Sequence, residues 1–161
     1  MALRVRNSKT VKVLKWVVLV ALVAFAVLQV LPLGRDHSNP PITAEPVWIT
    51  RDAREVAVAA CYDCHSNETR WPWYTDVIPW SWMTERDVER GRAELNFSEW
   101  DKPQPALATA DETLADDSMP PWRYLLLHPD VVLSDAEKES LVRALRFMQI
   151  QAAADAAENA G

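Results

Sequence analysis

One continuous apolar segment restricts the architecture of this 161-residue chain more than any other feature. Between Trp16 and Leu33 the only polar side chain is that of Gln29. A helix needs about 20 residues to cross a bilayer, so this segment lies at the lower limit. Because such a helix would be apolar on every face, it does not suit the surface of a soluble domain. We therefore predict a transmembrane anchor at residues 16–33.

The charges that precede this segment predict its orientation. Residues 1–15 contain no acidic residue and five basic ones, namely Arg4, Arg6, Lys9, Lys12 and Lys15. Basic flanks remain in the cytoplasm. We therefore expect a cytoplasmic N-terminus, a single pass through a bacterial inner membrane, and a periplasmic domain. A cleaved signal peptide is the alternative, with a processing site at Ala24-Phe25-Ala26, but the apolar run continues past it.

The chain beyond the anchor divides into three parts. Residues 34–46 contain three prolines in a polar context and predict a semi-rigid stalk. Residues 47–151 form the expected domain, and residues 152–161 form an Ala-rich tail that we expect to fray. The domain lacks the alternation of polar and apolar residues that strands show. Thr50 can cap a helix that runs into Cys61, and Ser134 begins a capping box that Glu137 completes.

Composition excludes several classes of function. The chain has three glycines and no phosphate-binding loop, and its two cysteines cannot form a disulfide framework. After residue 15 it contains 12 basic and 23 acidic residues. This acidic body argues against nucleic acid as a partner, because phosphate binding requires clustered Lys and Arg. It favours a protein partner with a basic docking surface.

Cys61, Cys64 and His65 form a C-x-x-C-H motif, the attachment signature of c-type haem. On a helix, residues at i, i+3 and i+4 share one face. Two thiols can then form thioethers with the haem vinyl groups while the imidazole ligates the iron from the proximal side. Three alternatives remain: a thiol–disulfide pair, a zinc site with His128 as fourth ligand, and two ordinary buried cysteines.

A sixth iron ligand can come from several residues. Met119 is followed by Pro120-Pro121, and a stiff loop holds a thioether at a lower entropy cost than a flexible one. His128 precedes a proline and is a less favoured ligand. We expect Met83 and Met148 to pack in the core. His37 lies in the predicted stalk, too far away, and an open sixth position is the remaining possibility.

Aromatic residues dominate the predicted domain. Six tryptophans follow the motif, and we expect most of them to be core, namely Trp71, Trp73, Trp80, Trp82, Trp100 and Trp122. Arg70 and Arg123 flank these aromatics. They are candidate partners for haem propionates, although simple solvation explains them equally well.

Three separated blocks of sequence resemble a known family. They are Cys61–Tyr74, Arg90–Trp100 and Met119–Pro129, and they look like the bacterial haem-binding domain family. The resemblance covers residues 47–147. It implies an all-α, cytochrome c-like haem domain behind the anchor, with Cys61 and Cys64 as attachment points and His65 as proximal ligand. Met119 stands at the family's Met-Pro position, which makes it the natural distal ligand.

Together these features predict a membrane-anchored protein with one covalent haem c. We expect a one-electron carrier with a redox partner protein rather than an enzyme. An open sixth position would instead indicate a ligand sensor or a peroxidase-like enzyme. Zinc at the motif would indicate a structural module.

Overall fold

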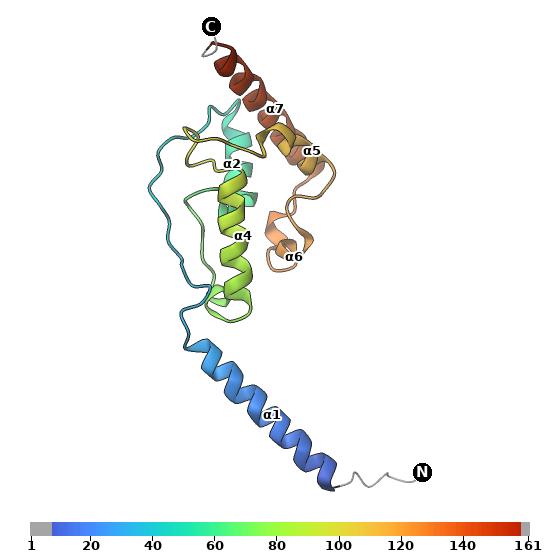
Figure 1. Cartoon of the computed structure of the whole chain (residues 1–161). Coiled ribbons are helices and arrows are strands. Elements are labelled where there is room, and N and C mark those ends of the chain that lie inside the picture. The colour runs from blue at the N-terminus through green and yellow to red at the C-terminus, as the bar shows by residue number, and fades with distance from the viewer. Residues whose placement is uncertain (1–7, 159–161) are drawn as a thin grey trace, which may run out of the picture.

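The structure is a computed structural model that describes residues 8–158, and within that range it contains helices and loops but no β-strand. Figure 1 shows a helical domain with one helix extending away from it. The longer helices are α1 (Ser8–Gln29), α2 (Arg51–Ala60), α4 (Trp80–Glu94) and α7 (Asp135–Glu158). The shorter ones are α3 (Tyr62–His65), α5 (Ala110–Ala115), α6 (Trp122–Leu125), and the 3-10 turns η1 (Trp73–Asp76), η2 (Leu107–Thr109) and η3 (Pro129–Val131). The all-α prediction is confirmed.

Helix α1 contains most of the predicted anchor. Within residues 8–158 it is the one helix long and apolar enough to span a membrane. It ends at Gln29, before the predicted end at Leu33, because Pro32 disfavours helical backbone before it and Gly34 has a φ of 71°. It begins at Ser8 and so includes three of the five basic residues of the flank. Arg4 and Arg6 lie outside the described residues.

Residues 34–46 lie along the flank of the domain. The Arg92 guanidinium donates to Ser38 O and to Asn39 Oδ1. Farther along, the Asn67 side chain donates to Pro41 O, and the Thr43 N–H donates to the carbonyl of Ser98. We expected a semi-rigid stalk. The segment is instead bonded to the domain and is not a free spacer.

The core lies between α2, α5, α7 and the loop that precedes η2. Its buried members are Ala57, Tyr62, Leu95, Phe97, Leu107, Ala110, Leu114, Leu141, Leu145 and Met148. Two predicted caps hold the helices that build it. Thr50 Oγ1 accepts the Ala53 N–H, and Ser134 N–H donates to the Glu137 carboxylate while Ser134 Oγ accepts the Glu137 N–H. The described part of the expected tail is helical, since α7 continues to Glu158. Alanine favours that helix.

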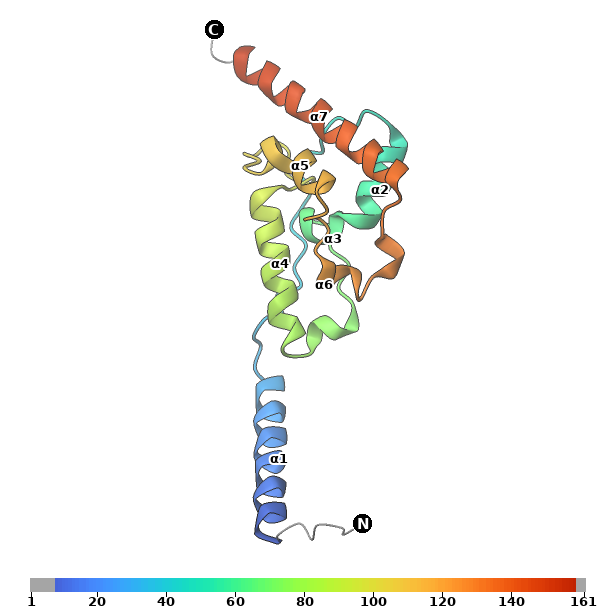
Figure 2. The same ribbon diagram turned by 90° about the vertical axis from the view of Figure 1, so that its right-hand side faces the viewer.

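Close packing between α3 and α4 positions the motif. Figure 2 shows α4 beside α3. A Cβ at Gly91 would lie 2.2 Å from the Cys64 carbonyl oxygen, a distance that no side chain tolerates. Only glycine therefore allows α4 to lie directly against the backbone of the motif.

Candidate functional site

The C-x-x-C-H motif forms one helical turn. Helix α2 ends at Ala60, and the chain bends at Cys61, whose φ is −120°. The N–H groups of Cys64 and His65 then donate to the Cys61 carbonyl, at 3.1 and 2.9 Å. The helix that we expected to run unbroken into the motif is therefore interrupted, but the spacing that places the three side chains on one face is kept.

A single hydrogen bond orients the His65 ring. Nδ1 lies 2.9 Å from the carbonyl oxygen of Leu95. Because a carbonyl only accepts, Nδ1 must hold the proton. Burial lowers the pKa of His65, against a smaller raising effect of the carbonyls of Leu95 and Gly91. The neutral ring therefore has its lone pair at Nε2, which is the form that binds a metal ion.

The two thiols are free and protonated. Burial raises the pKa of Cys61 and that of Cys64 to about 12, and Asp87 and Asp63 add to the effect at Cys64. Thiolates are the form needed for disulfide exchange and for zinc binding. Among residues 8–158 no group of three or more His, Cys, Asp or Glu side chains is arranged to hold a metal ion. The high pKa of both thiols therefore disfavours disulfide exchange, and the lack of a metal-holding group among these residues does not favour the zinc alternative.

A cleft opens beside Cys64. Its volume is about 240 Å³, somewhat less than the roughly 300–1,000 Å³ that ligand sites in proteins typically have. Its walls come from α3, η1, α4, α6 and the loops next to them. The lining residues are Asp63, Cys64, Thr69, Arg70, Pro72, Tyr74, Trp80, Met83, Thr84, Asp87, Val88, Trp122, Arg123, Tyr124, Leu126, Leu127 and His128. Such a surface, mainly aromatic and apolar, suits a wide flat ligand.

A hydrogen-bonded chain of side chains forms one wall of the cleft. The Asp63 carboxylate is buried, and it accepts from Arg70 Nε at 3.0 Å and Nη2 at 2.9 Å. It also accepts the Tyr124 hydroxyl at 2.9 Å. Tyr124 lies 61 residues from Asp63 in the sequence, so this bond ties α6 to the motif. The sequence alone did not predict the role of Asp63 as acceptor or that of Tyr124 as its donor. The one signal was that both residues lie within the blocks that resemble the family.

His128 is enclosed by two tyrosines. Its ring stacks on Tyr124 at 4.0 Å between centroids, and its Nδ1 lies 3.0 Å from the Tyr124 carbonyl oxygen. Nε2 therefore accepts the hydroxyl of Tyr74, at 2.9 Å. Both ring nitrogens have partners. To ligate iron, His128 would have to give up its bond with Tyr74.

The two predicted propionate partners both line the cleft, but each is already paired with a carboxylate. Arg70 pairs with Asp63, and Arg123 Nη2 lies 2.9 and 3.0 Å from the two carboxylate oxygens of Asp87. Both arginine side chains are exposed. Because each guanidinium is paired with a carboxylate, only part of its positive charge is available to a ligand at the rim of the cleft.

The methionines differ from expectation. Met148 is in the core, as expected, with 1% of its surface exposed. Met83 was expected there too, but it is 47% exposed and lines the cleft. Met119 is 43% exposed, its N–H donates to Thr113 O, and it does not line the cleft. His37 stacks on Trp71 at 4.4 Å, outside the cleft.

Several features of the site suit a haem ligand. The cleft adjoins the Cys64 thiol. The Cys61 thiol and the His65 imidazole belong to the same helical turn as Cys64. The imidazole is neutral and oriented through Nδ1, as a metal-ligating histidine requires. Cys64, Arg70, Arg123 and His128 are brought together at the cleft, whereas Cys61, His65 and Met119 are not among its lining residues.

The comparisons with known proteins agree with this fit. The family model described as a haem-binding domain matches residues 23–146. No curated protein and no solved structure matches the chain. The matched range includes the last third of α1, residues 34–46, the motif, the cleft and the first half of α7. Since it spans well over half of the sequence, the chain belongs to the haem-binding domain family.

Proposed function

We propose that the chain is a c-type haem protein in which Cys61 and Cys64 hold one haem through thioethers. His65 Nε2 is the proximal iron ligand. The observation that carries this proposal is the bond from His65 Nδ1 to the Leu95 carbonyl, beside an apolar cleft at Cys64. It leaves one imidazole nitrogen available within the turn that contains both thiols.

Covalent attachment compensates for the small size of the domain, whose core lies to one side of the cleft. Bound haem would supply a one-electron Fe(III)/Fe(II) couple. The chain fixes the proximal ring through Leu95, holds α6 to the motif through Asp63 and Tyr124, and surrounds the cleft with indole and leucine side chains. Met119 is the proposed distal ligand, because a loop residue can adjust toward the iron where a helix residue cannot.

The proposed role is one-electron transfer in the bacterial periplasm, not enzymatic turnover. Helix α1 would anchor the chain in the inner membrane with its basic flank in the cytoplasm. The acidic composition after residue 15 favours a redox partner with a basic docking surface.

One observation favours a second candidate, a peroxidase-like enzyme. The structure places His128 in the cleft together with Arg70 and Arg123. A histidine there could accept and return a proton during peroxide cleavage. Both nitrogens of His128 are occupied and both arginines are paired, so this arrangement supports the carrier more strongly.

The test is haem staining of a denaturing gel. The full chain is expressed in bacteria that attach haem in the periplasm, and Cys61→Ala/Cys64→Ala is compared with the wild type at equal protein level by immunoblot. Glu68→Ala, an exposed position three residues past the motif, is the matched control. We expect a stained band for the wild type and the control, and none for the double variant. A stained double variant would disprove attachment through these cysteines.

A further inference from the structure

We propose that the end of the domain formed by η1 and the first turn of α4 lies within the interfacial layer of the bilayer. Trp73, Trp80 and Trp82 would then lie among the lipid headgroups. The inference rests on the proposed role of α1 as membrane anchor. It adds a second site of lipid contact, provided by the domain itself, to that anchor.

The depth of this end follows from contacts with α1. The Gln29 side chain pairs with the backbone of Ile78, its Nε2 donating to Ile78 O and its Oε1 accepting the Ile78 N–H, each at 3.3 Å. Helix α1 has 22 residues and is about 33 Å long, close to the roughly 30 Å of a hydrocarbon core. When α1 spans that core, Gln29 lies at its outer boundary, and Ile78 lies at the same level.

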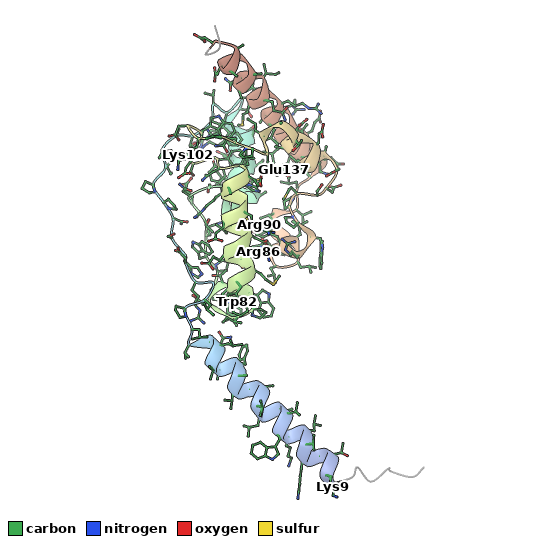
Figure 3. All side chains as sticks on the ribbon, in the orientation of Figure 1. Lys9, Trp82, Arg86, Arg90, Lys102 and Glu137 are labelled. Carbon is green, nitrogen blue, oxygen red and sulfur yellow. The ribbon has the colours of Figure 1, made fainter. Side chains whose placement is uncertain are left out.

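A second contact places the start of α4 there as well. A Cβ at Gly34 would lie 2.6 Å from the Trp82 backbone nitrogen, so the chain leaving α1 passes directly over the first turn of α4. The Ser81 hydroxyl also donates to the Leu33 carbonyl, at 3.4 Å. Figure 3 shows Trp82 at the end of α4 nearest α1, with Arg86 and Arg90 farther along the helix.

Three tryptophans are exposed at this end of the domain. Trp73 is 79% exposed, Trp80 46% and Trp82 39%. Large apolar side chains that gather on one exposed surface mark an interaction site. Tryptophan is enriched where membrane meets water, because its ring is apolar and its N–H is polar.

The cleft does not account for this exposure. Trp80 lines the cleft, so a ligand there could cover part of its ring. Trp73 and Trp82 do not line it. The occupant of their surface is therefore separate from the cofactor, and the adjoining end of α1 identifies it as the bilayer.

Photocrosslinking in native membranes tests the proposal on the full chain. p-Benzoylphenylalanine replaces Trp73 or Trp82 at the proposed surface. It also replaces Leu22, an exposed residue of α1, and Ile150, which is 69% exposed on α7. After irradiation, mass spectrometry of the purified protein detects a phospholipid adduct on the labelled peptide. The new side chain keeps an aromatic ring at positions 73 and 82, and all four sites are exposed to solvent.

We expect phospholipid adducts at positions 22, 73 and 82, at least ten times the yield at position 150. Three outcomes would overturn the inference while the anchor stands. The first is an adduct at position 22 without adducts at positions 73 and 82. The others are equal yields at positions 82 and 150, and crosslinks to protein in place of lipid. Adducts at 73 and 82 without one at 22 would support the surface and disprove the anchor. A lack of lipid adducts at every site would disprove both.

Discussion

Met119 and Met83 are the two thioethers that compete for the distal iron position. Met83 lines the cleft but belongs to α4, which is fixed to the motif at Gly91. Met119 lies in the loop before α6, where its N–H donates to the Thr113 carbonyl. A loop can move toward the iron at little cost in packing, whereas a helix cannot. The proposal therefore favours Met119.

The first prediction concerns the spectrum of Met119→Ala. A thioether ligand gives the oxidised protein a far-red sulfur-to-iron band and raises the reduction potential relative to a nitrogen ligand. We expect this variant to lose the band, to lower the potential, and to bind carbon monoxide when reduced. Absorption spectra and a redox titration measure all three.

Two matched variants show which side chain is responsible. Met83→Ala and His128→Ala should both retain the band. Loss of the band in Met83→Ala alone would move the ligand to the cleft wall. Rapid carbon monoxide binding by the wild-type ferrous protein would show an open sixth position and would favour the sensor or peroxidase-like alternatives.

Helix α4 lies in very close contact with α3 at Gly91. Because Gly91 meets the Cys64 carbonyl, Gly91→Ala must push α4 away from the motif. Overpacking of this kind costs about 1–3 kcal/mol. We expect a lower free energy of unfolding in urea and weaker haem staining per protein. Arg90→Ala, an exposed neighbour on the same helix, should leave both unchanged. If Gly91→Ala were as stable as the wild type, α4 and α3 would accommodate the added methyl group without cost, and the prediction would be wrong.

A carboxylate joins α5 to α7 and makes stability depend on pH. Asp111 accepts from Arg146 Nε at 2.8 Å and from Gln149 Nε2 at 2.7 Å. These two bonds, that of Arg146 first, hold the pKa of Asp111 below its ordinary 3.8. The stabilisation is therefore complete above pH 3.8 and is lost as the pH falls through the lower pKa of the folded state.

Asp111→Asn should consequently cost about 1 kcal/mol at neutral pH. The difference from the wild type should be equal at pH 7 and pH 5 and should shrink below pH 3.8, as measured by urea unfolding. Asp155→Asn, an exposed change on α7, is the control and should cost nothing measurable. A penalty that grows toward acid would contradict the assigned sign.

At the scale of the whole molecule, the features that sequence predicted are local ones. The caps at Thr50 and Ser134 depend on residues three positions away, and the motif depends on a single helical turn. The features that it missed depend on distant contacts. The bond from Tyr124 to Asp63 spans 61 residues, and the flank position of residues 34–46 depends on partners such as Arg92. No pattern within a short window specifies such pairs.

Met83 shows the same limit for burial. A methionine on a mixed helix face is usually core, and that expectation ignores a cleft formed by α6, some 40 residues later. Helix α1 is the opposite case, because its composition alone predicted that it would be separate from the domain. A segment that is apolar on every face is recognised without tertiary information, because the pattern lies entirely within the segment.

The last prediction concerns the topology of the whole chain. Basic residues before the apolar run should keep the N-terminus in the cytoplasm, and the run continues past Ala26 without a break. Protease added to spheroplasts should therefore digest the domain, and detergent should not be required. Intact mass analysis of the membrane-bound protein should show all of α1. A cytoplasmic protein examined in the same cells should remain intact, which verifies that the inner membrane is sealed. A mature N-terminus between residues 25 and 27, or a domain that resists protease until detergent is added, would show that α1 is a cleaved signal or is inserted in the opposite sense.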